Sequence, residues 1–483
     1  MADSLKQKTI SGMIWSGIQR FGTMGISFIS NMVLARLLTP EDFGCIGMLA
    51  IFITVSNTFV DGGFGSALIQ KKEPTQRDYS TIFWWNLFLS IVLYGVLYVG
   101  APYISQFYRI PLLSSVLRVQ GIVLIIHALN IIQSNQLRKR LNFKKLAVVN
   151  VVSQLVGVTV AIVTAWSGWG VWALVAQQIV ASSMTSLLLW TLNRWMPDLC
   201  FSMESFKQLF GFGSFILCSN LINTICNNVQ GLLIGRFFNP AIMGYYTQAR
   251  KLEEVASHSF SSVIDQVSYP VLSKFQSDND AMQNVLKKMV LMLSFVTFPL
   301  MLILVLIAEP LITLLYGVKW LSCVPYFQIL CVAGIAICLQ GIHYYAVASK
   351  GKSKDLFVWT IIKRIIGLAI LVGGMYLGGI KGLLWGCSIG SWVIFISNAY
   401  LVDKHINYTL LQQGKDLLPI LLVSLTAFVV GNILGDILLC NIYLKALIVG
   451  ISYLLTYIVI SYIFKVRALE MCIQTLKNYR TNK

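Results

Sequence analysis

Charge is scarce in this chain, and negative charge is the scarcest. Its 483 residues include 19 Asp and Glu against 37 Lys and Arg, and charged residues make up only 12% of the total. An average soluble domain has roughly 25%. Hydrophobic residues make up 57%, and the mean hydropathy is +0.73. This composition excludes an ordinary soluble protein and makes the lipid bilayer the expected solvent.

Patterns typical of catalysis or metal binding are also missing. The ten cysteines include no Cys-x-x-Cys pair and mostly fall in apolar segments, where cysteine acts as a small hydrophobe. The four histidines are scattered, which argues against a zinc cluster. There is no Gly-rich phosphate loop, no nucleophile elbow and no long polar loop that would carry a polymerase or glycosyltransferase site. We therefore expect neither an enzyme nor a bound cofactor.

Long apolar segments recur along the whole chain, and segments of at least ~18 such residues predict transmembrane helices. The connections are short, and no cleavable signal peptide is expected, because residues 1–8 are polar and no Ala-x-Ala site follows. The fourteen predicted helices are 9–37, 43–69, 80–106, 112–136, 146–167, 169–193, 207–236, 241–272, 286–317, 323–348, 356–378, 380–402, 417–438 and 443–464.

The net charge of +18 is a topology signal and not a nucleic-acid footprint. With the amino terminus in the cytoplasm, 25 Lys and Arg, Arg138 among them, fall in cytoplasmic segments and six on the opposite side. Cytoplasmic loops of membrane proteins carry this excess of positive charge. Because the predicted number of helices is even, both termini are expected in the cytoplasm.

One short pattern occurs twice, 200 positions apart. Residues 34–44 and 234–244 share apolar-x-Arg-x-x-[Thr/Asn]-Pro-x-x-x-Gly, at a point where one apolar segment ends and the next begins. The polar residues on both sides keep the same register and are spaced by three and four, so each set forms one face of a helix. Upstream, Gln19, Arg20, Thr23, Ser27 and Ser30 match Ser219, Asn220, Asn223, Asn227 and Gln230; downstream, Thr54, Asn57, Thr58, Asp61 and Gly65 match Glu254, Ser257, His258, Ser261 and Asp265. Two bundles with polar inward faces predict a transporter built from parallel repeats around a cavity.

Ionisable residues inside predicted helices are the first functional candidates, because burying a charge in a bilayer is costly. Arg20 either bonds to a neighbouring helix or lines a wet cavity. Arg250 and Glu254 are spaced to form an ion pair. Asp61 either binds a coupling cation or pairs with an arginine, and Arg118 either lines the outer cavity or extends to the surface.

The same reasoning leaves two basic residues outside the candidate site. Lys363 and Arg364 lie seven and eight residues into the predicted helix 356–378. If the membrane-spanning part of that helix starts at Trp359, both residues lie near the cytoplasmic interface. Their long side chains are then expected to extend to the cytoplasmic interface.

Three local sequences resemble those of bacterial polysaccharide flippases of the Wzx type: residues 59–72, residues 168–175, and Gly244-Tyr245-Tyr246. That family belongs to the multidrug/oligosaccharidyl-lipid/polysaccharide (MOP) exporter superfamily, and the resemblance covers essentially the whole chain. It implies an all-α fold with about fourteen transmembrane helices in two six-helix lobes. The implied division is 1–200, 201–405, and 406–483 for the last two helices and a basic tail.

The resemblance also implies a function. Such proteins move an undecaprenyl-pyrophosphate-linked oligosaccharide to the outer leaflet of the bacterial inner membrane, alongside a polysaccharide polymerase and glycosyltransferases. Relatives that flip the peptidoglycan precursor use cavity arginines in helices 1 and 8. Arg20 and Arg250 match them by helix and approximate depth, not by a local motif.

The residue chemistry fits that cargo, since arginine suits pyrophosphate and Asn, Gln and hydroxyl groups suit sugars. The expected substrate-binding residues are Arg20, Arg250, Arg118, Gln19, Thr23, Asn220, Asn223 and Asn227, and the candidates for H⁺ or Na⁺ coupling are Asp61, Glu254 and Asp265. The alternative is a cation-coupled multidrug exporter of the same fold. A membrane scaffold within a polysaccharide-synthesis complex is a third interpretation, but it leaves the paired polar stripes unexplained.

Overall fold

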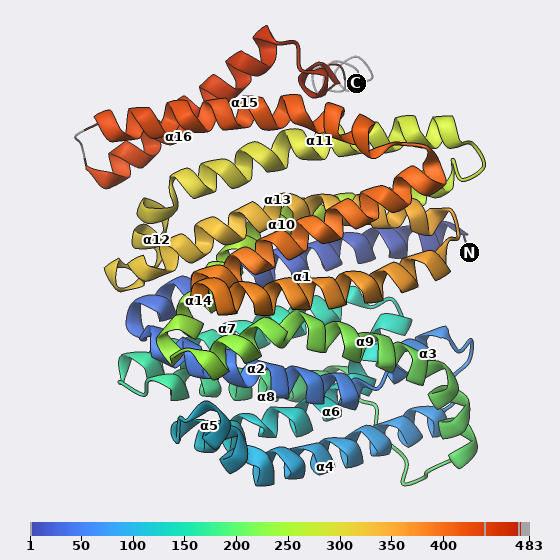
Figure 1. Ribbon diagram of the computed structural model, residues 1–483. Coiled ribbons are helices and arrows are strands. Elements are labelled where there is room, and N and C mark those ends of the chain that lie inside the picture. The colour runs from blue at the N-terminus through green and yellow to red at the C-terminus, as the bar shows by residue number, and fades with distance from the viewer. Residues whose placement is uncertain (1, 439–440, 472–473, 475–483) are drawn as a thin grey trace. The chain divides into compact units, whose positions relative to one another are not determined.

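The computed structural model describes residues 2–438, 441–471 and 474. Among these, the side chains of residues 2–10, 13, 212, 258, 260 and 262–266 are not described. The described residues form helices and no strands (Figure 1). The helices are α1 (Ala2–Leu37), α2 (Pro40–Asp61), α3 (Phe64–Gln70), α4 (Gln76–Tyr108), α5 (Leu112–Gln120), α6 (Ile122–Lys139), α7 (Phe143–Trp166), α8 (Val171–Asn193), α9 (Met203–Phe237), α10 (Pro240–Ser273), α11 (Asn279–Leu306), α12 (Ala308–Tyr316), the 3-10 helix η1 (Val318–Cys323), α13 (Val324–Ser349), α14 (Ser353–Ile406), α15 (Leu410–Ile437) and α16 (Ile442–Ile463).

Each of the fourteen predicted helices has a helical counterpart, although fewer pass a test of length and apolarity. Ten helical segments of the described chain are long and apolar enough to cross a membrane, and α9 is an eleventh if its two parts, bent by 51°, count as one. The single helix α14 contains two predicted spans. The helices α1 and α10 are not among the eleven, because the polar stripes predicted from the sequence lower their hydropathy.

The chain divides into two compact units, Met1–Gly244 and Tyr245–Lys483. In the first unit α7 packs against α1 and α8, and α9 packs against α2, α3 and α4. In the second unit α13 packs against α11 and α14, and α15 packs against α11 and α16. The division into 1–200, 201–405 and 406–483 stays a prediction.

The repeated sequence pattern is also a repeated structure. Thr39 caps α2 through a capping box with Asp42, whose carboxylate accepts from the Thr39 N–H at 2.9 Å. In the second copy the Asn239 side chain accepts from the Ile242 N–H at 2.9 Å. In both copies a proline follows the cap as the first helical residue, where its missing N–H costs nothing.

The glycines that end the two copies contact the prolines of the opposite copy. A Cβ atom on Gly44 would lie 1.8 Å from the carbonyl oxygen of Pro240, and one on Gly244 would lie 1.9 Å from that of Pro40. Real Cβ atoms essentially never come closer than 3.0 Å to such an atom. The repeated pattern therefore forms a reciprocal backbone contact between the starts of α2 and α10, and only glycine leaves room for it.

The predicted helix 43–69 is interrupted directly after Asp61. Gly62 and Gly63 have φ of 57° and 70°, in the left-handed region that favours glycine. A Cβ on Gly63 would lie 2.4 Å from the carbonyl oxygen of Gly213, next to the bend in α9. The break fixes Asp61 as the last residue of α2.

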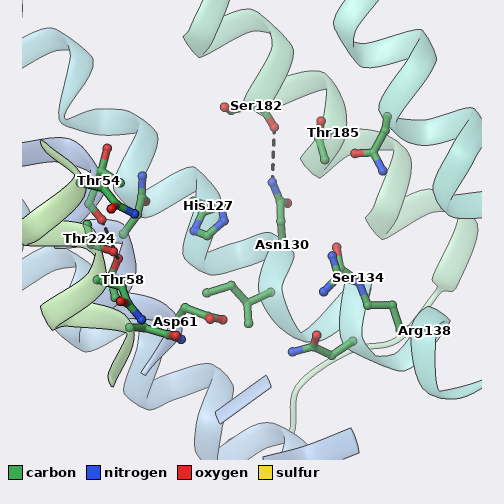
Figure 2. Close-up of a pocket in the computed structure, with 17 residues that line it drawn as sticks. Thr54, Thr58, Asp61, His127, Asn130, Ser134, Arg138, Ser182, Thr185 and Thr224 are labelled. Carbon is green, nitrogen blue, oxygen red and sulfur yellow. Dashed lines mark hydrogen bonds between the residues drawn. The ribbon is translucent and has the colours of Figure 1, made fainter. Parts of the chain in front are cut away.

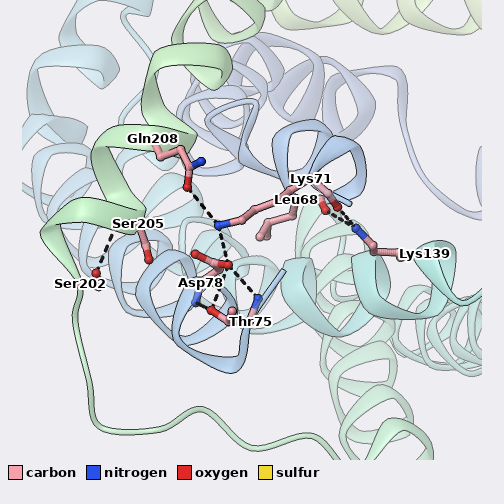
Figure 3. Close-up of polar contacts among 8 residues, drawn as sticks. All are labelled: Leu68, Lys71, Thr75, Asp78, Lys139, Ser202, Ser205 and Gln208. Atoms are coloured by element: carbon pink, nitrogen blue, oxygen red, sulfur yellow. Dashed lines mark hydrogen bonds and ion pairs between the residues drawn. The ribbon is translucent and has the colours of Figure 1, made fainter. Parts of the chain in front are cut away.

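Polar contacts hold the short helix α3 at its carboxyl end (Figure 3). Lys71 pairs with the buried Asp78 at 2.8 Å and donates to Gln208 of α9 at 3.1 Å. Lys139 of α6 donates to the backbone carbonyls of Leu68 at 3.0 Å, Ile69 at 3.3 Å and Lys71. A cation bonded to the last carbonyls of a helix stabilises its end.

The long α14 is a hairpin of two antiparallel halves. Gly378 and Gly379 are non-helical, and φ at Gly379 is 56°. A Cβ on Gly374 would lie 2.3 Å from the carbonyl of Gly382, and the reverse distance is 2.1 Å. Small residues at such positions allow two helices in a membrane to approach closely.

Candidate substrate cavity

A polar cavity of about 630 Å³ lies within the first unit (Figure 2). Five helices contribute to it: α2, α6, α7, α8 and α9. The lining residues are Thr54, Asn57, Thr58, Asp61, His127, Asn130, Ile131, Ser134, Asn135, Arg138, Asn150, Ser182, Thr185, Asn220, Asn223, Thr224 and Asn227. Ile131 is the one apolar side chain among these seventeen.

The cavity exists because polar stripes on neighbouring helices face each other. Residues 54, 57, 58 and 61 of α2 and residues 220, 223, 224 and 227 of α9 recur at intervals of three and four, so each set lies on one face. Where α2 packs against α9, the hydroxyls of Thr58 and Thr224 lie 3.2 Å apart. The structure thus brings four predicted residues together, Asp61, Asn220, Asn223 and Asn227.

Asparagine dominates the lining, with seven of the seventeen residues. Each amide carries donors and an acceptor. Asn57 Oδ1, Asn130 Oδ1 and Asn135 Nδ2 are buried and have no hydrogen-bond partner in the described part of the chain. Buried polar atoms are normally paired, so unpaired ones at a cavity wall are ready to bond to water or a hydroxyl-bearing ligand.

Charge in the cavity is nearly balanced. Asp61 is the one acidic lining residue and Arg138 the one residue with a permanent positive charge. The Asp61 carboxylate lies within electrostatic range of His127 and, more weakly, of Arg138. Arg138 is therefore in a position to serve the arginine-pairing interpretation of Asp61, and the coupling interpretation stays a prediction.

A second, smaller cavity of about 300 Å³ adjoins the first through the shared residues Asn150 and Thr185. Its lining includes the predicted residues Gln19 and Thr23 of α1. Arg20 lies between them in sequence but is exposed and lines neither cavity.

The remaining predicted residues lie elsewhere. Arg118 of α5 donates to the carbonyl of Tyr98 at 3.3 Å, and its guanidinium lies 4.6 Å from the centre of that ring. In the second unit Arg250 pairs with Glu254 at 2.8 Å, as its spacing predicts, and also donates to the Tyr246 hydroxyl at 2.8 Å. The side chain of Asp265 lies outside the described residues.

Several functional candidates escaped the sequence reasoning. Arg138 was expected only as a cytoplasmic loop charge, and His127 was not singled out, yet both line the larger cavity. The spacing of His127, Asn130, Ser134 and Arg138 contains the signal, because three- and four-residue steps place them on one face of α6.

The expectation for Lys363 is wrong. Its side chain does not extend to the interface but is 4% exposed and donates to Asn398 Oδ1 at 2.6 Å. Asn398 in turn donates to the carbonyl of Gln340 on α13 at 3.2 Å. A partner 35 residues away in sequence keeps the ammonium inside the protein.

Solved structures with a similar fold are transporters. The lipid II flippase MurJ, in an inward closed conformation, superposes with a TM-score of 0.76 at 15% identity, and the match covers 94% of this chain and 98% of MurJ. An inward-facing multidrug resistance MATE transporter of the MOP superfamily gives 0.60 at 14% identity, covering 82% and 98%. These likenesses confirm the predicted all-α, MOP-like membrane fold.

Similar sequences belong to proteins of polysaccharide synthesis. The teichuronic acid biosynthesis protein TuaB of Bacillus subtilis is 26% identical, covering 87% of this chain and 88% of its own. The lipopolysaccharide biosynthesis protein WzxC of Escherichia coli is 25% identical, covering 82% and 80%, and the succinoglycan biosynthesis transport protein ExoT of Rhizobium meliloti is 24% identical, covering 82% of each. A family model described as polysaccharide biosynthesis protein matches residues 33–325. This multi-pass membrane protein therefore belongs to the polysaccharide biosynthesis protein family.

Proposed function

We propose that this protein is a flippase that moves a lipid-linked oligosaccharide across the bacterial inner membrane for polysaccharide synthesis. The observation that carries the proposal is the cavity of the first unit, in which sixteen of seventeen lining residues are polar and seven are asparagines. Amide groups both donate to and accept from sugar hydroxyls. Membership of the family and the fold shared with MurJ support the same function.

The cargo divides into parts with different needs. The sugars require a wet, hydrogen-bonding cavity, which the asparagines and threonines supply. The pyrophosphate requires planar cationic donors, and Arg138 is the arginine in the cavity, with Arg20 and Arg250 as the further predicted partners. The polyprenyl tail remains in lipid, and alternating access carries the head group across.

The wider setting belongs to the same proposal. The excess of basic residues on one side supports cytoplasmic termini. A polysaccharide polymerase and glycosyltransferases are the expected neighbours, and H⁺ or Na⁺ is the expected coupling ion.

Multidrug export is the competing function, because a MATE transporter shares the fold. A pocket for lipophilic cations is expected to offer aromatic faces and acidic groups. The seventeen described lining residues include one acid and no Phe, Tyr or Trp. The lining therefore favours the sugar.

Binding to the purified protein separates the two functions. The probes are a polyprenyl-diphosphate trisaccharide, the same lipid diphosphate without sugar, and tetraphenylphosphonium as a lipophilic cation. We expect the glycolipid to bind most tightly and the cation not to bind. Tight binding of the cation without binding of the glycolipid would refute the flippase.

Two asparagines of α9, Asn223 and Asn228, provide the matched variants. Asn223 lines the cavity, whereas Asn228 donates to the Thr224 carbonyl at 2.8 Å and does not line it. Asn223→Leu should weaken the trisaccharide lipid by roughly five- to ten-fold, the value of one or two hydrogen bonds, and leave the sugar-free lipid unchanged. Asn228→Leu should affect neither lipid. Equal losses in both variants would place the sugar elsewhere.

A further inference from the structure

Two adjacent glutamates of α10 have opposite environments. Glu254 forms the ion pair with Arg250, and its side chain is 40% exposed. Glu253 is 4% exposed, and its Oε1 has no hydrogen-bond partner among the described residues. Neighbouring helical residues point about 100° apart, so one carboxyl faces its cation and the other faces the interior.

The Glu253 carboxyl sits in a notch that a glycine leaves open. A Cβ on Gly334 of α13 would lie 2.6 Å from Glu253 Oε1 and 3.0 Å from the sulfur of Met301 of α11. Cys331 of α13 is buried and within electrostatic range of the carboxyl. On its own helix, Ser257 is the polar neighbour one turn away. The notch is thus built from two other helices of the same unit, and its walls are largely apolar.

The position along α10 makes ionisation difficult. Glu253 follows the first helical residue, Pro240, by thirteen positions, which is about 20 Å of helix. That depth is well inside a hydrocarbon layer of about 30 Å. An ionised carboxylate without a cation or several donors is strongly disfavoured there, and such groups become neutral instead.

No cation of the described residues neutralises this carboxyl by pairing with it. Arg250, one turn away on the same helix, lies within electrostatic range of Glu253, but its ion pair is with Glu254 and it also donates to the Tyr246 hydroxyl. Cys331, Gly334 and Met301 of the other helices lie next to the Glu253 carboxyl in the described part of the chain, and none of these three is cationic. An ionised carboxylate at this position would therefore lack a paired cation while the notch is closed.

We propose that Glu253 is the proton-binding group that couples this transporter to a pH gradient. With the notch at Gly334 closed, the carboxyl keeps its proton; when α10 and α13 separate and water enters, the O–H bond breaks, the proton leaves to water and a carboxylate remains. Reclosure requires a proton to return. The proposal rests on the transport function proposed above, but it does not depend on which sugar is carried.

The protonation state can be measured without any cargo. Infrared spectra of the purified protein at about pH 7, where ordinary Asp and Glu side chains are ionised, report the carbonyl stretch of a carboxylic acid that is still protonated. We expect such a band in the parent protein, its loss in Glu253→Gln and its retention in Glu309→Gln, which changes an exposed glutamate of α12. A parent spectrum without the band, or a Glu253→Gln spectrum that keeps it, would overturn the proposal.

Coupling is measured in proteoliposomes with the polyprenyl-diphosphate trisaccharide as cargo. When one proton is coupled to each transport cycle, a gradient of about one pH unit shifts the equilibrium distribution of the cargo by about ten-fold. It should raise net transport several-fold in the parent and in the control Glu309→Gln, a change at an exposed position of α12. It should not do so in Glu253→Gln, which should still exchange cargo without a gradient. If Glu253→Gln responds to the gradient like the parent, the coupling group lies elsewhere. If the parent binds none of the lipid while the infrared assignment holds, the flippase fails and the proton site stands.

Discussion

Replacing Gly44 or Gly244 by alanine tests the reciprocal contact between the two copies of the repeated pattern. In Gly44→Ala the new Cβ must move from 1.8 Å to at least 3.0 Å from the Pro240 carbonyl oxygen, a separation of about 1.2 Å. The opposing atom belongs to the backbone, so no side-chain rotation relieves the clash. The starts of α2 and α10 must therefore move apart.

The energetic cost follows from the same geometry. Overpacking of a close contact costs roughly 1–3 kcal/mol, which corresponds to a population shift of about 5- to 150-fold away from the arrangement that contains the contact. Gly244→Ala should act in the same way, because its Cβ would lie 1.9 Å from the Pro40 carbonyl oxygen. The double variant should cost less than the sum of the two, because one separation admits both methyl groups.

Spin labels at two exposed positions, Glu41 and Phe237, make this separation measurable. Distance distributions from electron paramagnetic resonance should gain a longer component in Gly44→Ala and Gly244→Ala. Gly95→Ala is the control, because nothing lies within 4 Å of a Cβ at that helical position, and it should leave the distribution unchanged. Parent-like distributions and thermal unfolding in both repeat variants would refute the contact.

Three further changes test other parts of the structure. Asp78→Asn should lower the free energy of unfolding by about 1–3 kcal/mol, because it leaves the buried end of the Lys71 pair without its charge; unfolding in detergent at the parent's midpoint would contradict this. Lys363→Met should match or exceed the thermal stability of the parent, since an apolar chain of similar length replaces an ammonium that has one amide partner; a large loss of stability would show that the charge is needed. In a background without cysteine, an impermeant thiol reagent added to cells should label Val318→Cys but not Arg140→Cys, and the reverse pattern would invert the predicted topology.

The sequence predicted the helices and one wall of the cavity because both are periodic properties of a single segment. The intervals between Asn220, Asn223 and Asn227 are the same in sequence and in structure, so their common face needs no knowledge of other helices. Asp61 was predicted by the same argument, and it lines the same cavity; its role in coupling stays a prediction.

What the sequence could not show depends on contacts between helices. The interior position of Lys363 depends on Asn398, and no local pattern links them. Glu253 and Glu254 are the same residue type at adjacent positions, so the sequence does not show which one is buried. Glu253 is buried because it packs against Gly334 of α13. Arg138 fits the excess of positive charge in cytoplasmic segments, so the sequence offered no separate reason to place it in the cavity wall.

The reversal at Gly378 and Gly379 has a consequence for how the chain enters the bilayer during synthesis. Two non-helical residues are too few to remain in water while one half of α14 waits for the other, so the halves should insert together as one unit. The ends of the two halves far from this turn lie together, because Asp355 contacts Lys404 at 3.2 Å. Lys352 adds a basic residue just before the first half. The two lysines, Lys352 and Lys404, resist translocation at this shared end, so the orientation of the first half of α14 also fixes that of the second.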